Sequence, residues 1–431
     1  MLKKTVETGW YVTMIGIKMT RNYYIKTACR LCDSNQLTQV LSLTPTALCD
    51  EYLKIPKNQP VYPLDLFQCD VCQFVQTGYV VNPETIYSDY IYITTSSSDL
   101  SMHFASYSNQ VMDNLKLKEG SFVVDVGSND GTLLSFFQKK GCKVLGVEPC
   151  KKIAEDATAR GIETAAAFFD WDFSKKIKAA HGSADLITLN NVFANIDDLK
   201  ALTKGLSYLL ADEGVLIIES SYLLDMVSNM VFDFIYHEHL SYLSIFPLAR
   251  FFAQFELKLI RIESVVTKGG SLRYYFARTL SHHVVDPSVF IFSEQEKQKN
   301  ISPHFFNQWT HEIQAIKKTL IAELEKHKGK KIVAYGASAT STTLIYHFEL
   351  HKYIDCLIDD NVRKVGTYSP GLHIPVQSLA DTSLDKDAIV LILAWRFQKA
   401  ICKKLANLGC TVIIPLPSVR VAVLNPSAEV I

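Results

Sequence analysis

Short apolar runs alternate with amphipathic stretches from residue 121 onward. The segment "FVVDVGSNDGTLLSFFQKKG" predicts an apolar strand, a glycine-containing turn and a helix, and "CKVLGVEP" predicts a second strand that ends in an acid. The later segments "ADLITLNNVF", "GVLIIESSYL", "LKLIRIESVV" and "LRYYFAR" are also typical of strands, with helical stretches between the earlier ones. This order predicts a doubly wound α/β sheet with hairpin-like final strands.

A second strand, glycine turn and helix begin near residue 330, in "KKIVAYGASATSTTLIYHF". Further strands are predicted in "IDCLIDDN", "AIVLILAW" and "CTVIIPLP", so the C-terminal part should form a second, smaller α/β domain. The residues between the two blocks, 279–329, are rich in His, Gln, Lys and Glu and contain a helical period. We expect them to form a helical linker.

The composition is that of a globular protein with several domains: 431 residues, of which 48% are hydrophobic and 20% are charged. The 44 basic residues balance the 44 acidic residues, so no general field would attract nucleic acid or an anionic membrane. The longest apolar runs are too short to span a bilayer, and the N-terminus lacks the pattern of a secretion signal. We therefore expect a cytoplasmic protein that binds neither nucleic acid nor membrane.

Four of the ten cysteines form two C-x2-C pairs, "CRLC" and "CDVC", which contain Cys29, Cys32, Cys69 and Cys72. In a large cytosolic chain this spacing favours a metal site over disulfides, and four thiolates complete the tetrahedral set that zinc prefers. Because no position would remain for a reactive water, the predicted zinc is structural. The segment between the pairs is longer than in a compact zinc ribbon, so unrelated buried cysteines are the alternative.

The first glycine turn has features of a nucleoside site. Gly127 and Gly131 allow a ligand to approach the backbone, while Asp130 and the first amides of the following helix offer polar contacts. Glu148 ends the next predicted strand, where a carboxylate can accept both hydroxyls of a ribose. The turn lacks the G-x-G-x-x-G pattern of dinucleotide sites and the lysine of a P-loop. A nucleoside ligand fits better, with a nucleotide-binding turn of another kind as the alternative.

Taken together, the motifs resemble those of the three-domain sugar C-methyltransferases, which act on nucleotide-linked keto-deoxysugars. The likeness extends from about residue 27 to about residue 415. It rests on the two C-x2-C pairs and on "VVDVGSNDGTLL", "GVEP", "NVFANIDDL", "FDFIYHEHLSYLS", "GGSLRYYFAR", "AYGASA", "DDNVRKVGTYSPGLHIPV" and "ILAW". The resemblance implies a class I S-adenosylmethionine (SAM)-dependent methyltransferase domain with a zinc-binding domain before it and a Rossmann-like domain after it.

The resemblance also implies domain boundaries and partners. We expect a loose extension (1–26), a zinc-binding domain (27–88), a methyltransferase domain (89–278), a helical linker (279–329) and a C-terminal Rossmann-like domain (330–431). The last domain would help to hold the nucleotide of a keto-sugar substrate, with "GASATST" on the phosphate side. We expect a monomer or a weak oligomer.

Individual residues receive roles from the same resemblance. The four cysteines match the zinc ligands of the family, and Tyr236, Glu238 and His239 match its catalytic run. In "SDYIYITTSS" we assign Tyr92 to the active site, with Tyr90 as the competing choice. The cofactor is SAM, which we assign to Gly127, Ser128, Asp130, Gly131, Glu148 and Asn191. Asn195 completes the catalytic group.

The run "YHEH" suits carbon methylation. A proton next to a ketone can be removed, and the enolate that remains is a carbon nucleophile. Histidine has a pKa suited to take this proton, a neighbouring carboxylate can stabilise its cation, and a tyrosine hydroxyl can hydrogen-bond the enolate oxygen. We expect His239 to be the base and the carbon to be C-3 of a 4-keto sugar. His237 should point away, since adjacent side chains diverge. The alternative is that the run caps a helix or strand.

Four positions depart from the family pattern. The chain has Asn195 where the family has His, and Lys268 where it has the His of "HGGS". It has Thr340 where the family has the Lys of its C-terminal glycine turn, and Arg396 where it has Asn. Arg363, Lys364 or Arg396 could replace the missing phosphate contact. Two other functions stay open, O-methylation of a related sugar and a non-catalytic zinc- and SAM-binding protein.

Overall fold

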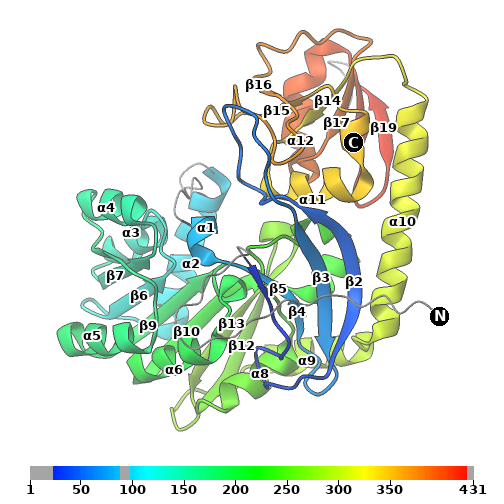
Figure 1. Ribbon diagram of the computed structural model, residues 1–431. Helices are drawn as coiled ribbons and strands as arrows, with labels where there is room; N and C mark the ends of the chain where they lie inside the picture. The colour runs from blue at the N-terminus through cyan, green and yellow to red at the C-terminus, as the bar shows by residue number, and fades with distance from the viewer. Residues whose placement is uncertain (1–22, 88–97, 425–431) are drawn as a thin grey trace, which may run out of the picture.

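The structure is a computed structural model that describes residues 23–87 and 98–424. The strands of these residues form four sheets, of which three build the body of the molecule (Figure 1). No helix in the two described ranges combines the length and the apolar character needed to cross a membrane.

The central sheet has seven strands in the order β12-β13-β10-β9-β6-β7-β8. Neighbouring strands are parallel except β13, which runs antiparallel to both β10 and β12. This is the strand order of the class I methyltransferase fold, as expected from the sequence. The strands are β6 (Phe122–Val126), β7 (Lys143–Glu148), β8 (Thr164–Ala166), β9 (Ala184–Asn190), β10 (Leu210–Ser221), β12 (Leu257–Val265) and β13 (Ser271–Arg278).

Apolar side chains on both faces of this sheet explain why its strands read as continuous apolar runs. Val124 and Val126 of β6 pack in one core with residues of α5, α6 and α8. Val123 packs in the opposite core with residues of α2 and α3. The helices of this domain are α2 (Ser98–Leu115), α3 (Thr132–Gln138), α4 (Lys151–Ala159), α5 (Trp171–His181), α6 (Leu199–Leu209), α7 (Leu223–Ser228) and α8 (Ile245–Ala253).

The N-terminal part forms an antiparallel sheet in the order β11-β4-β3-β2 and a separate two-stranded pair, β1-β5. Strand β11 belongs to the central part of the sequence, so this sheet joins two regions that are far apart along the chain. The elements are β1 (Tyr23–Ile25), β2 (Leu37–Thr46), β3 (Tyr62–Cys69), β4 (Val75–Thr77), β5 (Tyr79–Val81), α1 (Pro83–Tyr87) and β11 (Ser241–Tyr242).

The C-terminal sheet has the order β16-β15-β14-β17-β18-β19 and is parallel except for β19. One apolar core includes residues of this sheet, of α10, of β2 and β3, and of the segment around α7. Figure 1 shows α10 running beside β2 and reaching the C-terminal domain. The elements are α9 (Pro287–Lys299), α10 (Pro303–Glu325), β14 (Ile332–Tyr335), α11 (Ala339–Phe348), β15 (Cys356–Ile358), β16 (Val376–Gln377), β17 (Ile389–Ile392), α12 (Gln398–Leu405), β18 (Thr411–Ile414) and β19 (Arg420–Val423).

Candidate active site

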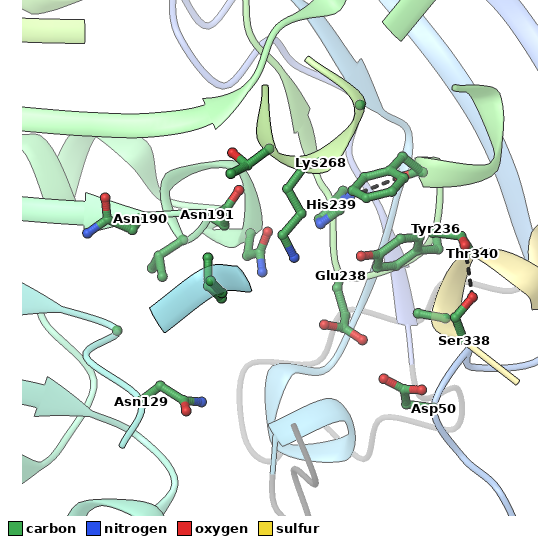
Figure 2. Close-up of a pocket in the computed structure, with 18 of the residues that line it drawn as sticks. Asp50, Asn129, Asn190, Asn191, Tyr236, Glu238, His239, Lys268, Ser338 and Thr340 are labelled. Atoms are coloured by element: carbon green, nitrogen blue, oxygen red, sulfur yellow. Dashed lines mark hydrogen bonds between the residues drawn. The ribbon is translucent and has the colours of Figure 1, made fainter. Parts of the chain in front are cut away.

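A cavity of about 1700 Å³ is lined by residues of all three sheeted regions. On one side are the turns that follow β6, β7 and β9, and on the other are the turns that follow β14, β15 and β17. Figure 2 shows Tyr236, Glu238, His239 and Lys268 between these two sides. The sequence-assigned residues that line it are Gly127, Ser128, Glu148, Asn191, Asn195, Tyr236, Glu238 and His239.

The turn after β6 requires glycine at its first position. Gly127 has a φ of 74°, and a Cβ atom there would lie 2.3 Å from Cγ2 of Val192. Glu148 closes the turn, because its Oε2 accepts from the amide of Asn129 (3.0 Å) and its Oε1 from the amide of Cys150 (2.9 Å). A carboxylate has further lone pairs, so both oxygens can still accept ligand hydroxyls. Burial raises the pKa of Glu148.

Asp130 and Gly131 lie behind the turn rather than on the cavity wall described by the structure. Oδ1 of Asp130 accepts from the amide and the hydroxyl of Thr132, at 3.2 and 2.6 Å. Gly131 precedes α3 with a φ of 75°, and a Cβ atom there would lie 2.8 Å from Cγ2 of Ile162. We therefore propose that these two residues shape the turn and support the ligand site indirectly.

Asp125 is a cavity residue that the sequence analysis missed. It sits in β6 and accepts hydrogen bonds from Thr188 (2.6 Å) and Asn190 (3.4 Å). Burial raises the pKa of Asp125 to about 7. A single acid inside an otherwise apolar strand, "FVVDV", was the signal that could have found it.

Two buried amide oxygens on this side, Oδ1 of Asn190 and of Asn195, have no protein partner among the described residues. Since buried polar atoms are nearly always hydrogen-bonded in native proteins, they point to a polar ligand. With the Gly127 cradle and the Glu148 carboxylate, this donor and acceptor set fits SAM. Asn191, which has a φ of 57°, lines the same wall.

The ring of His239 is held by the backbone. Its Nδ1 lies 2.8 Å from the carbonyl oxygen of Phe234, and its centroid lies 4.1 Å from that of the Tyr236 ring. Burial lowers the pKa of His239 to about 4, with a smaller contribution from the positive charge of Lys268. Burial raises the pKa of Tyr236 well above its usual value. The imidazole is therefore neutral and the phenol protonated at neutral pH, and burial makes this imidazole a weaker base than the sequence analysis expected.

His237 points away from the cavity, as expected. Its Nε2 contacts the carbonyl oxygen of Tyr62 at 3.3 Å, and its ring lies against the Tyr62 ring at the start of β3. Tyr222 donates to Glu296 of α9 at 2.9 Å and is buried. Tyr92 and its competitor Tyr90 lie outside the described residues.

The N-terminal sheet holds the segment that ends at His239 in place. Directly after His239, β11 pairs with β4, where Ser241 lies opposite Gln76. The carbonyl of Leu240 accepts from the amide of Thr77 (3.0 Å), and the amide of Leu240 donates to Ala194 beside Asn195 (2.8 Å). The backbone directly after His239 is thus fixed by hydrogen bonds to β4 and to the turn that carries Asn195.

The four paired cysteines lie together, with all four Sγ atoms within 4.8 Å of one another. Two Sγ···Sγ distances, Cys29 to Cys72 and Cys32 to Cys69, are 3.5 Å. A tetrahedral zinc with Zn–S bonds of about 2.3 Å places its sulfurs slightly less than about 4 Å apart. Both the geometry and the thiolate chemistry fit a structural zinc, and the alternative of unrelated buried cysteines is excluded by this clustering.

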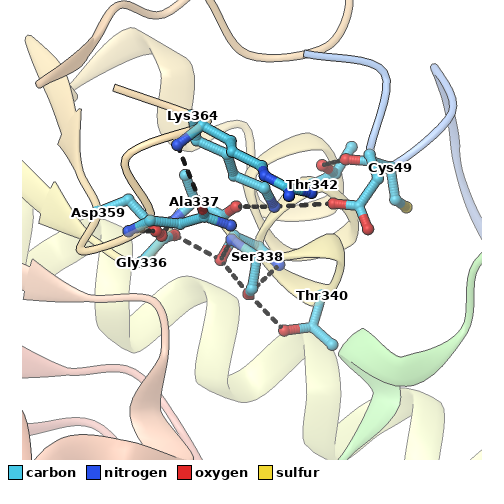
Figure 3. Close-up of polar contacts among 12 residues, drawn as sticks. Cys49, Gly336, Ala337, Ser338, Thr340, Thr342, Asp359 and Lys364 are labelled. Atoms are coloured by element: carbon cyan, nitrogen blue, oxygen red, sulfur yellow. Dashed lines mark hydrogen bonds and ion pairs between the residues drawn. The ribbon is translucent and has the colours of Figure 1, made fainter. Parts of the chain in front are cut away.

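A network of polar contacts covers the C-terminal side of the cavity (Figure 3). Nζ of Lys364 donates to the carbonyl of Ala337 (2.7 Å) and pairs with Asp50 of the N-terminal region (2.9 Å). Arg396 donates to Oγ1 of Thr340 (3.1 Å) and pairs with the buried Asp233 (3.2 Å). Arg363 is exposed and is not part of the cavity wall. Asp50 could not have been found from sequence, because no local pattern marks it.

Comparisons with known proteins agree with this architecture. Three family models match in succession: "Putative zinc binding domain" at residues 29–87, "Methyltransferase domain" at 103–262 and "C-methyltransferase C-terminal domain" at 266–417. The C-methyltransferase NovU of Streptomyces niveus is 29% identical over 404 residues, which are 91% of this chain and 96% of that protein.

Two solved structures with detectable likeness are methyltransferases of low sequence identity. A SAM-dependent methyltransferase from Clostridium acetobutylicum ATCC 824 is 15% identical with a TM-score of 0.34, covering 45% of this chain and 95% of its own. Magnesium protoporphyrin IX methyltransferase from Synechocystis PCC 6803, with bound SAM, is 13% identical with a TM-score of 0.33, covering 45% and 88%. The three successive family models and the match to NovU along nearly its whole length support a SAM-dependent methyltransferase that is similar to a C-methyltransferase and contains a matched zinc-binding domain.

Proposed function

We propose that the chain transfers the methyl group of SAM to a carbon next to the ketone of a nucleotide-linked 4-keto-deoxysugar. The expected carbon is C-3, and the product would be a branched sugar for polysaccharide or related biosynthesis. The observation that carries the proposal is one cavity in which a neutral histidine lies between two nucleoside-type turns. O-methylation, the alternative, would need no such base placed for carbon deprotonation.

The two turns are built alike, which supports two nucleoside ligands. In the central domain the amide of Gly127 donates to the carbonyl of Val147 (2.7 Å), and Glu148 is the last residue of that strand. In the C-terminal domain the amide of Gly336 donates to Ile358 (2.8 Å), and Asp359 follows. Like Glu148, Asp359 accepts from two backbone amides, those of Ala337 (2.7 Å) and Asn361 (2.8 Å). We assign the first turn to SAM and the second to the nucleotide of the substrate.

The charges on the second side suit a diphosphate. Two cations, Lys364 and Arg396, line the cavity next to the turn from Ala337 to Thr340. Ser338 caps α11, the helix that starts here, and the N-terminus of a helix favours an anion. Arg396 contacts Thr340, the position at which the family has lysine. We propose that Arg396 supplies the positive charge that the turn itself lacks.

His239 is the proposed base. A carbonyl oxygen can only accept, so the contact with Phe234 requires the proton on Nδ1, and the lone pair is then on Nε2. The orientation of the ring thus comes from its backbone surroundings rather than from Glu238. The Tyr236 hydroxyl is protonated and can donate to the enolate oxygen, while Glu238 would stabilise the imidazolium. When bound, SAM would supply a methyl group on a positively charged sulfur.

The test uses SAM with a ¹³C-labelled methyl group and thymidine diphosphate 4-keto-6-deoxyglucose as the probe substrate. The proposal expects a labelled methyl that shows one-bond coupling to a ring carbon in the NMR spectrum of the product. A labelled methyl bonded to oxygen would contradict the proposal and favour O-methylation. If related 4-keto sugars also stay unlabelled, a nucleotide-linked keto-sugar is not the substrate.

A further inference from the structure

The loop between β12 and β13 carries a lysine whose backbone is held in an unusual conformation. Lys268 has a φ of 58°, a left-handed conformation that non-glycine residues seldom adopt. Such strain persists only where the surroundings enforce it, and it is concentrated at functional sites.

The surroundings of Lys268 are correspondingly rigid. The carbonyl of Gly269 accepts from Asn229 (3.0 Å), and the carbonyl of Gly270 accepts from the amide of Tyr222 (3.3 Å). A Cβ atom at Gly270 would lie 2.5 Å from Cβ of Asp225 in α7. The loop therefore packs closely against α7, and hydrogen bonds hold the carbonyls of both glycines. These contacts fix the position of the Lys268 backbone.

The side chain enters the cavity beside the proposed catalytic group. Figure 2 shows Lys268 next to His239, with Glu238 and Tyr236 around the same space. Burial and the positive charge of Arg396 lower the pKa of Lys268, while Glu238, Asp50 and Glu219 oppose this effect. The positive charge of Lys268 therefore acts on His239, while the negative charge of Glu238 acts on Lys268.

We propose that Lys268 is a further catalytic residue, whose ammonium group hydrogen-bonds the enolate oxygen formed when His239 removes the proton next to the ketone. The C–H bond breaks, an N–H bond forms at Nε2 of His239, and the electron pair moves to the carbonyl oxygen. Lys268 keeps its own proton throughout. This inference rests on the proposed function.

The charge pattern explains why such a lysine would help specifically in the transition state. In the free protein the cation of Lys268 disfavours the imidazolium of His239. Once negative charge develops on the oxygen beside Lys268, this repulsion is offset, and Glu238, His239, the enolate and Lys268 alternate in sign. An interaction that becomes favourable only as the proton moves accelerates the reaction rather than merely tightening binding.

The experiment measures proton removal without methyl transfer. The enzyme is incubated with S-adenosylhomocysteine and thymidine diphosphate 4-keto-6-deoxyglucose in heavy water, and hydrogen exchange next to the ketone is followed by NMR. Lys268→Met, which removes both the N–H donors and the charge, should slow exchange by about 10²-fold or more, the usual cost of losing one oxyanion donor. Lys268→Arg, which keeps the charge, and Lys268→His, the family residue, should stay within about tenfold of the wild type, a far smaller loss than that of one such donor.

Two controls separate this role from others. Melting temperature and S-adenosylhomocysteine affinity of Lys268→Met should match the wild type, because a purely structural lysine would change them. Wild-type exchange rates in a folded Lys268→Met variant would overturn the inference. So would a borohydride-trapped sugar adduct on Lys268, which would indicate a covalent imine. If the wild type exchanges no hydrogen in any keto-sugar nucleotide, the proposed function itself fails, which is a different outcome.

Discussion

Nε of Arg30 donates to Oδ1 of Asp197 at 2.8 Å and so ties the zinc-binding turn to the loop that carries Asn195. Arg30 lies between Cys29 and Cys32, and its side chain is fully buried. Lys26 also pairs with Asp197, at 3.0 Å. Together with the pairing of β11 and β4, this contact makes the N-terminal region part of the frame of the active site. SAM would bind mainly to the central sheet, which has its own core.

Zinc removal should therefore impair catalysis more than SAM binding. We expect one zinc per chain by metal analysis, and Cys72→Ser should lose it, because three thiolates bind zinc less well than four. In that variant proton exchange should fall by about tenfold or more, the range expected when a supporting shell is loosened, while SAM affinity changes much less. Cys356→Ser, at a buried cysteine outside the cluster, is the control and should retain zinc. Freshly purified wild type without zinc would contradict the assignment.

His239→Asn tests the base directly. The side-chain amide of asparagine can replace Nδ1 as the donor to Phe234, but it has no counterpart of Nε2. Exchange and methylation should fall together by about 10² or more, the usual size of general base catalysis. Exchange and methylation should fall less in Tyr236→Phe than in His239→Asn. If His239→Asn abolished methylation but exchanged hydrogen at the wild-type rate, the base would lie elsewhere, and Tyr236 would be the first candidate.

The fold followed from local signals, whereas much of the site depends on pairings between distant segments. Alternating apolar runs and glycine turns predicted both α/β domains, because each strand and turn carries its own pattern. The union of β11 with β4 could not be predicted, since "SY" is too short to carry a strand pattern. The orientation of His239 depends on a backbone carbonyl of Phe234, and backbone groups leave no mark in the sequence. The same holds for Asp50, which reaches the cavity from the N-terminal region.

Glu148 should affect the binding of SAM, and Asp359 should independently affect the binding of the substrate nucleotide. Glu148→Gln should weaken SAM binding, because the amide replaces one of the two oxygens that hold the turn and could accept from a ribose. Asp359→Asn should weaken binding of thymidine diphosphate for the same reason. A loss of one charged hydrogen bond corresponds to about 10- to 100-fold in affinity. Calorimetry with each ligand on each variant checks this, and a variant that weakened both ligands equally would argue against two independent turns.

Buried histidines should make the protein sensitive to acid. Burial lowers the pKa of His347 to about 4, against about 6.5 in an unfolded chain. As pH falls from 6.5 towards 4, the unfolded chain therefore binds more protons than the folded one, and the free energy of unfolding decreases. The slope is about 1.4 kcal/mol per pH unit for each such histidine.

The variant His347→Asn isolates this effect. Its Oδ1 can still accept from the amide of Thr44, which donates to Nδ1 of His347 at 3.2 Å, but the side chain no longer titrates. Urea unfolding at pH 7.5 and pH 5 should show a smaller loss of stability for this variant than for the wild type. His311→Asn, at an exposed position, is the control. Equal losses in wild type and His347→Asn would mean that His347 is not a source of the acid sensitivity.

A positive charge on the nucleotide side of the cavity should support ligand binding from either of two positions, residue 396 or residue 340. Arg396 contacts Thr340 at 3.1 Å, and these are the two positions at which the family has asparagine and lysine instead. Arg396→Asn should weaken thymidine diphosphate binding by about 10- to 100-fold, as expected for a lost hydrogen bond to a charged group. It should also reduce stability, because the buried carboxylate of Asp233 would lose its ion pair. Only the hydrogen bond that Trp395 donates to Asp233 (2.9 Å) would remain of these two contacts.

Adding Thr340→Lys to Arg396→Asn restores the family arrangement and should recover most of the diphosphate affinity. The reason is geometric: the guanidinium of Arg396 already touches the side chain of residue 340, so a lysine there brings its charge to the same wall of the cavity. Calorimetry at two salt concentrations should show the salt dependence of binding lost in the single variant and regained in the double variant. Arg363→Ala, at an exposed residue off the cavity wall, is the control for a general loss of positive charge. If a folded double variant bound thymidine diphosphate no better than Arg396→Asn, the cation at this wall would not serve the phosphates, and Lys364 would become the next cavity cation to test.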